Sequence, residues 1–444
     1  MSNWQDAEQH ADRALDLFER GRWSEAEREL RKALDIDPDK GDWHFNLGLT
    51  LERCGRDAEA LSSFEQASRL LPEATSPQLA AGSACLRLAR FKDAIECLES
   101  VLAEDQACET AWAMLIDART SIDDHDGAET TFYMAQDALP DSSAIVLVAM
   151  CESLLIRELW DRAAWCAREA MKLDQNVPGG RIRLASALIA KGEGQQASQL
   201  LLLELRQDPG NVQALLLHAD LLVDSGKNQE AMMKLHRILE LEPANVQAHV
   251  RAGAIAMEDR RWEESFIAWG LVRRLDPSHP TASLYLAKTL LAMGRNEAAR
   301  PLLQERLDRM DEGESRESKL EMATLLLQAH EPAMAVPLLN ELAKDRNDTV
   351  QLRLLAVALF ASDQRDEGAA ISRRVLRLQP DCISSMHNLA LAAFFSNRYK
   401  LAWGWVQKGL KIDPRDEELR RLRSRLIWKS IRSFYGKLIG LRLN

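Results

Sequence analysis

Residues 43–72, WHFNLGLTLERCGRDAEALSSFEQASRLLP, contain two amphipathic helices and the turn between them. Small or apolar residues recur at the spacing of a helix face in two runs: Leu47, Gly48 and Leu51, then Ala60, Phe64 and Ala67. Gly55 separates the two runs, and Pro72 ends the second. This stretch therefore predicts a helical hairpin.

The same pattern returns along nearly the whole chain. Twelve units can be placed, with first residues at 7, 41, 75, 109, 144, 178, 212, 246, 280, 316, 349 and 383. Each unit has a small residue at its twentieth position: Ala26, Ala60, Ala94, Ala128, Ala163, Ala197, Ala231, Ser265, Ala299, Ala335, Gly368 and Ala402. The eighth position is also small in eleven units, with Ile116 as the exception. A period of this length predicts a repeat array rather than separate domains.

The recurring residue types have a packing explanation. Two antiparallel helices approach closely only where the side chains at their crossing are small, and larger apolar residues fill the spaces beside the crossing. Proline, which closes eight of the units, cannot continue a helix. One hairpin cannot bury both faces of both helices, so neighbouring units must share a continuous core.

The pattern resembles the tetratricopeptide repeat, and the resemblance covers residues 7–414. It implies an all-α, right-handed α-solenoid superhelix of antiparallel helix pairs, with first helices lining a concave face. Some family positions differ: the usual aromatic residue at the fourth position occurs only as Trp112, and the usual tyrosine at the eleventh is mostly leucine. Two specialised grooves of such arrays, the clamp for chaperone C-termini and the asparagine ladder of a glycosyltransferase, lack most of their residues here.

The segments outside the regular units divide the chain further. We predict repeats 1–9 over 7–309, an acidic loop over 310–315 and repeats 10–12 over 316–414. Residues 415–444 are predicted to form a basic amphipathic helix or tail, with six more basic than acidic residues. Such a helix can cap the last repeat, or it can lie on an anionic membrane or an acidic partner.

Composition and motifs exclude several classes of function. The net charge of −11 argues against non-specific nucleic-acid binding. Seven cysteines without a CxxC pattern argue against a disulfide framework or a zinc site, and His218, His236 and His249 match no standard metal spacing. No nucleophile motif or phosphate-binding loop occurs. We expect no catalytic residues, no cofactor and no metal.

The resemblance places a partner-binding groove on the first helices of units 5 to 9. An apolar strip with spaced charges runs along the positions expected to face it, and soluble proteins seldom leave such a strip uncovered. The candidate groove residues are Glu152, Arg183, Leu217, Asp220, Arg251, Met257, Tyr285 and Lys288. The three basic residues among them are expected to pair with acidic groups of the partner.

The predicted function is a non-catalytic scaffold or adaptor that binds a peptide or partner protein in this groove. The alternative is a membrane-peripheral assembly or secretion factor attached through residues 415–444. The start of the chain has no signal-peptide pattern and no stretch is long and apolar enough for a membrane span, so a cytoplasmic protein is expected. The partner's identity and the oligomeric state stay open.

Overall fold

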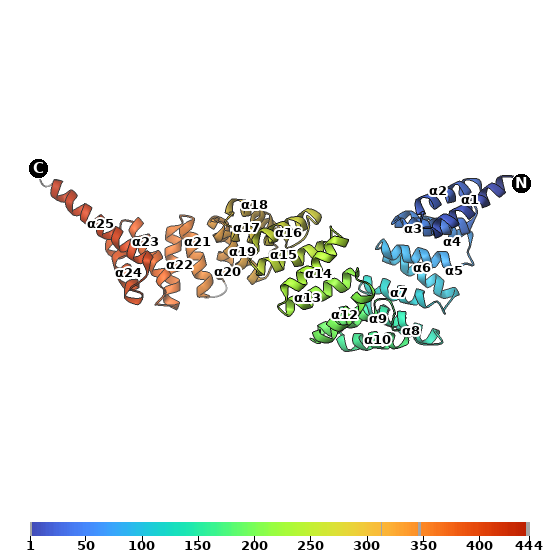
Figure 1. Ribbon diagram of the computed structural model, residues 1–444. Helices are drawn as coiled ribbons and strands as arrows, with labels where there is room; N and C mark the ends of the chain where they lie inside the picture. Colours follow the sequence, from blue (N-terminus) through green and yellow to red (C-terminus); the bar gives the residue numbers. More distant parts are fainter. Residues whose placement is uncertain (1, 312, 345–347, 441–444) are drawn as a thin grey trace. The chain divides into compact units, whose positions relative to one another are not determined.

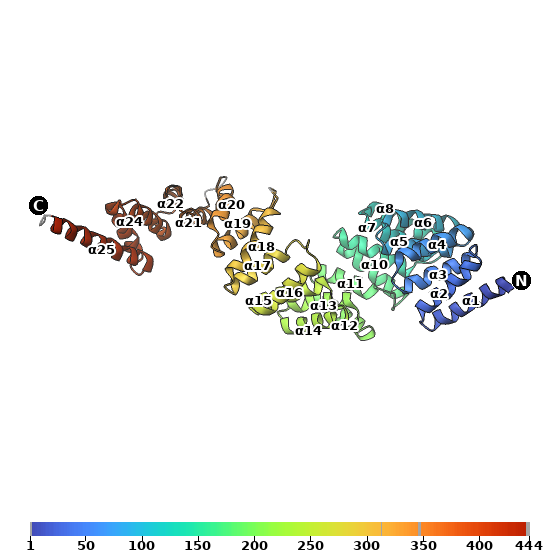
Figure 2. The same cartoon turned by 90° about the horizontal axis from the view of Figure 1, so that it is seen from above.

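The computed structural model describes residues 2–311, 313–344 and 348–440. All regular secondary structure in these residues is helical, in 25 α-helices. The chain divides into two compact units, Met1–Leu241 and Glu242–Asn444. Within each unit the helices follow one another in chain order, as the labels in Figures 1 and 2 show.

The first unit contains seven helix pairs. Their bounds are α1 Ser2–Glu19, α2 Trp23–Ile36, α3 Gly41–Arg53, α4 Asp57–Leu70, α5 Thr75–Arg87, α6 Phe91–Glu104, α7 Glu109–Ser121, α8 His125–Ala138, α9 Ala144–Ile156, α10 Trp160–Leu173, α11 Gly180–Ala190, α12 Gly194–Gln207, α13 Val212–Asp224 and α14 Asn228–Leu241.

The second unit contains five helix pairs and a long last helix. Their bounds are α15 Val246–Glu258, α16 Trp262–Leu275, α17 Ala282–Ala292, α18 Asn296–Asp308, α19 Arg316–Gln328, α20 Pro332–Lys344, α21 Thr349–Ala361, α22 Arg365–Leu378, α23 Ile383–Phe395, α24 Tyr399–Ile412 and α25 Glu417–Gly440.

The small residues predicted at the helix crossings are buried in every pair. The residue at position 20 is buried in all twelve repeats, from Ala26 in α2 to Ala402 in α24. The residue at position 8 is likewise buried throughout, including the exception Ile116. The sequence-based expectation of an all-α solenoid of antiparallel helix pairs is therefore confirmed.

The turn between the two helices of a pair contains one residue in the left-handed region. It stands at position 15 in all twelve repeats, where seven residues are not glycine and five are. The former are Ala89, Asp123, Glu158, Arg260, His330, Asp363 and Asn397, and the latter are Gly21, Gly55, Gly192, Gly226 and Gly294. The chain thus reverses direction in the same way in each hairpin.

The packing between repeats distinguishes the two helices of a pair. Within each unit, odd-numbered helices of successive repeats contact one another directly, for example α7 with α9 and α19 with α21. The even-numbered helices of successive repeats make at most marginal contact in the described residues. Successive odd-numbered helices are therefore closer together than successive even-numbered helices. The free faces of the odd-numbered helices form the inner surface of each unit.

The described part of α25 acts as a cap on the second unit. Leu419, Leu422 and Leu426 are buried against α23 and α24 and share a core cluster with Ala390 and Val406. This burial confirms the predicted capping helix. The side chains from residue 430 onward, the second half of the predicted basic helix or tail, lie outside the described residues.

The predicted segment boundaries remain a prediction. In the region of the predicted acidic loop, α18 ends at Asp308 and α19 begins at Arg316. Ser315 caps α19 by accepting a hydrogen bond from the backbone N–H of Ser318. No helix in the described part of the chain is long and apolar enough to cross a membrane.

Candidate functional site

Two of the predicted groove residues form an ion pair on the inner surface of the first unit. Glu152 lies in α9 and Arg183 in α11, and the guanidinium Nε lies 2.9 Å from the carboxylate Oε2. Glu152 is 42% exposed at its side chain and Arg183 is 23% exposed. The pair therefore joins two successive repeats.

Asp117 in α7 adds a second carboxylate to this pair. Burial raises the pKa of the Asp117 carboxyl to about 6, Arg183 opposes that rise, and Glu152 adds to it. The residue stands at position 9 of its repeat, as Glu152 does in the next one. Three successive inner helices thus bring together two acidic groups and one basic group, and sequence reasoning missed Asp117.

The other two predicted groove residues of this unit lie on α13. Leu217 is half-buried and packs against the large core cluster that extends from α6 to α13. Asp220 is half-buried one turn further along the same helix. Leu217 therefore contributes to the core as well as to the inner surface.

In the second unit, Tyr285 and Lys288 belong to one set of contacts. The Tyr285 ring in α17 stacks on the buried indole of Trp269 in α16, with ring centroids 4.6 Å apart and an angle of 11° between the planes. The Lys288 ammonium lies 4.5 Å from the centre of the Tyr285 ring. It also lies 2.6 Å from the carboxylate of Glu321 in α19.

Arg251 and Met257 lie on α15 of the same unit. Met257 is half-buried and packs against the core cluster around Trp269. The Arg251 guanidinium donates to the backbone carbonyl of Gln247 in its own helix at 3.4 Å. Two of the three predicted basic groove residues, Arg183 and Lys288, are thus paired with carboxylates of this chain.

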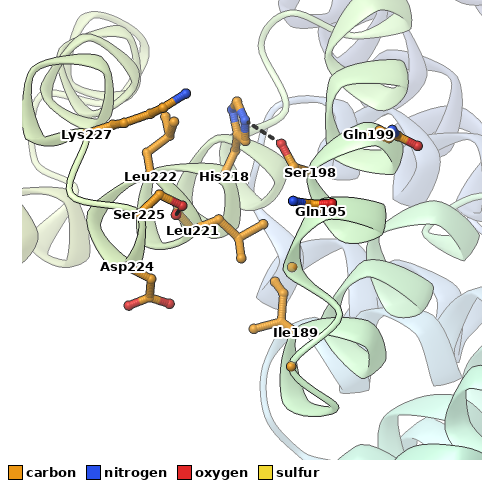
Figure 3. A pocket seen from close by; sticks show the side chains of 12 residues that line it. Ile189, Gln195, Ser198, Gln199, His218, Leu221, Leu222, Asp224, Ser225 and Lys227 are labelled. Atoms are coloured by element: carbon orange, nitrogen blue, oxygen red, sulfur yellow. Dashed lines mark hydrogen bonds between the residues drawn. The ribbon is translucent and has the colours of Figure 1, made fainter.

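A pocket that sequence reasoning did not predict lies between α12 and α13 of the first unit (Figure 3). Its volume is about 780 Å³, within the range of ligand sites. It is lined by Ile189, Gly192, Gly194, Gln195, Ser198, Gln199, His218, Leu221, Leu222, Asp224, Ser225 and Lys227. Only Ile189 and Asp224 of these stand at the positions expected to face the groove. The pocket is therefore separate from the predicted groove site.

His218 forms one wall of this pocket and is only 5% exposed. Its Nε2 lies 3.2 Å from the Ser198 hydroxyl, the contact drawn in Figure 3, while its Nδ1 has no hydrogen-bond partner. Burial and then the nearby Lys234 ammonium lower the pKa of the imidazole. The His218 ring is therefore neutral, and only one of its two nitrogens has a hydrogen-bond partner.

The histidine, cysteine and carboxylate side chains elsewhere in the described residues do not form a metal or nucleophile site. No cluster of three or more metal-ligating side chains occurs in the described residues. All seven cysteines are free thiols. Burial raises the pKa of Cys151 to about 12 and that of Cys166 to about 11, so both are protonated thiols in the core rather than nucleophiles.

Comparison with known proteins supports the repeat assignment. The family model of the tetratricopeptide repeat matches residues 11–75, 79–143 and 216–273. No curated protein matches the chain significantly. These matches coincide with helix pairs of the described structure, and all twelve of its pairs share their crossing residues and turn geometry, so the chain is built of repeats of the tetratricopeptide type.

Several solved structures are similar at low identity. A tetratricopeptide repeat protein from Parabacteroides merdae ATCC 43184 has 16% identity and a TM-score of 0.41, over 64% of this chain and 99% of that one. The APC/C hetero-tetramer Cut9–Hcn1 gives 15% identity and a TM-score of 0.34, over 93% of this chain and 95% of that one. Yeast Tom70 gives 16% identity and a TM-score of 0.35, over 96% of this chain and 96% of that one. Likeness at this level says nothing about the partner of this chain.

Proposed function

We propose that this protein is a non-catalytic scaffold that binds a segment of a partner protein along the inner surface of its first unit. Proteins built of such repeats generally serve protein–protein interaction. The observation that carries the proposal is the combination of uncovered apolar side chains and a one-sided charge on that surface. Leu15 on α1 is 52% exposed and Ile156 at the end of α9 is 51% exposed.

A small apolar cavity opens between α1 and α3 on the same helices. Its volume is about 100 Å³, and Leu15, Phe18 and Leu49 are among the residues that line it. All three stand at positions of the repeat expected to face the groove. A partner's apolar side chain can bury surface here, which favours binding in proportion to the area removed from water.

The charge on the inner positions of the first unit is mainly negative. Nine acidic residues occupy them: Glu8, Asp12, Glu19, Asp42, Glu52, Asp117, Glu152, Asp220 and Asp224. Three basic residues do so: Arg53, Arg87 and Arg183. Arg87 pairs with Glu52 and Asp57, and Arg183 pairs with Glu152. These two cations are therefore engaged within the chain, and the inner positions keep an excess of acidic residues.

This distribution supports a partner segment that is basic and amphipathic. Charges of opposite sign speed encounter and reject partners of the wrong sign, while apolar contacts supply most of the affinity. The proposal therefore differs from the acidic partner expected from Arg183, Arg251 and Lys288 alone. In the second unit, Arg251, Met257, Tyr285 and Lys288 remain proposed contact residues on a surface of their own.

The test compares two sets of charge reversals of equal size. The first variant, Asp12→Lys with Asp42→Lys, changes exposed acidic residues of the inner surface. The control, Asp35→Lys with Glu65→Lys, changes exposed acidic residues of the second helices α2 and α4. Cross-linked partners are captured from native lysate with each chain and quantified by mass spectrometry.

A specific partner is expected to be reduced about tenfold or more with the inner variant and retained by the control, since each unfavourable charge contact costs on the order of 1 kcal/mol. Circular dichroism must show the same helix content in all three chains. Equal capture by both variants would contradict the proposed surface.

The membrane alternative has no supporting observation in the described residues. The described side chains of α25 are accounted for by the cap, since its leucines are buried against α23 and α24. We therefore do not include membrane attachment in the proposed function.

A further inference from the structure

We propose that the pocket between α12 and α13 binds the side chain of a tyrosine residue in a partner polypeptide. The proposal does not depend on the inner-surface groove, because most of the pocket is built from turn residues and the second helix α12. Two departures from the repeat pattern meet in this one place, at position 17 of the sixth repeat and position 7 of the seventh.

The first departure is a missing side chain at position 17. Five repeats have an aromatic ring there, at Trp23, Phe91, Trp160, Trp262 and Tyr399, whereas the sixth repeat has Gly194. Gly194 is the only glycine at this position among the twelve repeats. The pocket therefore lies where five other repeats place an aromatic side chain of their own.

The geometry of neighbouring repeats supports this equivalence. His125 at position 17 of the fourth repeat lies 3.0 Å from Ser153, which is at position 10 of the next repeat. A Cβ atom built on Gly194 would lie 3.2 Å from Leu221, which is also at position 10 of its next repeat. The absent side chain would thus point into the pocket.

The second departure, His218, gives the pocket a polar wall together with Ser198. Position 7 is leucine, methionine or alanine in ten repeats, but the seventh repeat has His218, which is nine-tenths buried and meets Ser198 at position 21. A buried nitrogen without a partner costs free energy, so the unpaired Nδ1 makes this residue a poor choice for stability alone. A buried polar group without a partner in a native protein calls for an explanation, and a bound ligand supplies one here.

The lining selects an aromatic ring that bears a hydroxyl group. Ile189, Leu221 and Leu222 provide apolar surface for a ring. The Ser198–His218 pair can arrange its protons in two ways, and a phenolic hydroxyl suits both because it donates and accepts. An indole N–H only donates, and a phenyl ring does neither.

The size and rim of the pocket suit a residue within a polypeptide. The volume of about 780 Å³ exceeds that of one ring and leaves room for flanking backbone. Gln195, Gln199, Asp224 and Lys227 are exposed polar side chains around it, as Figure 3 shows. Such groups can bond the peptide units on either side of a buried ring.

The experiment uses the full chain and three small probes. N-acetyl-tyrosinamide represents the tyrosine residue, N-acetyl-phenylalaninamide lacks the hydroxyl, and 4-methylphenol lacks the peptide groups. Binding is followed by NMR of the Leu221 and Leu222 methyl groups. N-acetyl-tyrosinamide is expected to give saturable shifts with Kd on the order of 1 mM, as befits a small ligand. It should bind about tenfold more tightly than the phenylalanine probe, the effect of one hydrogen bond.

Variants separate the pocket from other surfaces. Gly194→Trp introduces the kind of aromatic residue that five other repeats have at this position and should abolish the shifts. Asn296→Trp introduces the same residue at position 17 of the ninth repeat and should leave them unchanged. Ser198→Ala should remove the preference for the hydroxyl.

Three results would overturn the proposal. The first is an absence of saturable shifts in the native chain, and the second is undiminished binding in Gly194→Trp with native circular dichroism. The third is equal affinity for the tyrosine and phenylalanine probes. Binding of 4-methylphenol as tight as that of N-acetyl-tyrosinamide would assign the pocket to free phenols and overturn the polypeptide part.

Discussion

At the scale of single residues, the turn position of each repeat shows how backbone geometry constrains the chain. Position 15 is left-handed in all twelve repeats, yet seven residues there carry a Cβ atom. A left-handed residue other than glycine costs about 1 kcal/mol because its Cβ approaches the neighbouring carbonyl oxygen. Asp123, Asp363 and Asn397 are the types that tolerate this region best, whereas Ala89 has no polar group to compensate.

We predict that Ala89→Gly stabilises the first unit. The φ angle of Ala89 is 56°, so the substitution relieves a steric cost that exceeds the added entropy of glycine in the unfolded chain. The expected gain in the free energy of unfolding is about 0.5–1 kcal/mol, measured by urea denaturation. The reverse control, Gly55→Ala, replaces a residue with φ of 73° and should lower stability. A loss of stability in Ala89→Gly would contradict this account.

We also predict that His218→Leu stabilises the protein. Leucine restores the residue type found at position 7 of the preceding repeat and removes the unpartnered Nδ1. The free energy of unfolding should rise by about 1 kcal/mol, while the tyrosine probe binds more weakly. Leu184→His, which introduces a buried histidine at the same position one repeat earlier, should be destabilising instead. If His218→Leu lowers stability, the imidazole has a structural role.

At the scale of helices, the size of the residue at position 8 is matched by the residue at position 24. Gly48 faces Phe64 and Gly253 faces Trp269, and a Cβ atom at either glycine would lie within 3.0 Å of the ring. Both rings are almost fully buried. These crossings therefore allow no larger residue than glycine without movement of a core aromatic side chain.

Substitution Gly48→Ala should destabilise the first unit for this reason. The expected loss is about 1–3 kcal/mol, since the new methyl group overpacks the crossing with Phe64. The double variant with Phe64→Leu should be less destabilised than the sum of the two single changes, because leucine makes room for the methyl group. Thermal and urea unfolding of the four chains form the test. Additive losses would show that the two residues do not compete for the same space.

The buried carboxyl of Asp117 in α7 should make the stability of the protein depend on pH. Its pKa is raised by burial to about 6 from 3.8, so the native state holds this proton more tightly than the unfolded state does. The charged form therefore costs stability above about pH 6, and the cost disappears as the pH falls from about 6 to about 4. Asp117→Asn should raise the free energy of unfolding at pH 7.5 by up to about 3 kcal/mol.

The gain in Asp117→Asn should shrink as the pH is lowered to 4.5. The measurement is urea unfolding of both chains at several pH values, with Asp35→Asn as an exposed control in α2. A gain that stays constant between pH 4.5 and 7.5 would show that the Asp117 carboxyl does not titrate in this range.

At the scale of the whole molecule, stability is divided among local cores. Each repeat contacts only its neighbours, and the two compact units have large core clusters of their own, one around Cys151 and Leu188 and the other around Trp269 and Leu303. In such an array the effect of a substitution decays over a few repeats.

We predict that hydrogen exchange will show this locality. Gly48→Ala should speed amide exchange in α1 to α6 and leave residues 242–444 unchanged, and Gly253→Ala should speed exchange around α15 to α17 and leave α1 to α6 unchanged. Exchange is measured peptide by peptide by mass spectrometry. A uniform rise across both units in either variant would mean that the chain unfolds as one cooperative body.

The sequence by itself determined the architecture, because small residues at two positions of a period of 33 to 36 residues allow the two helices of each pair to cross closely, and the pattern recurs along the chain. The all-α class and the helix pairs followed from spacing, whereas the spacing of Leu419, Leu422 and Leu426 left a cap and a surface-binding helix both open until their burial in the structure showed the cap. Only the tertiary structure decided which charges have partners. Arg183 and Lys288 looked available in the sequence, but a neighbouring inner helix places a carboxylate beside each, the preceding one for Arg183 and the following one for Lys288.

Two unusual residues in the sequence belong to the pocket, but the sequence alone does not show that they come together. Gly194 and His218 depart from their repeat positions, yet they belong to different repeats and are 24 residues apart. Whether a missing side chain leaves a space, and what lines that space, depends on how two neighbouring helices approach each other. Such non-local contacts are set by packing between repeats, and the periodicity of either repeat alone does not contain them.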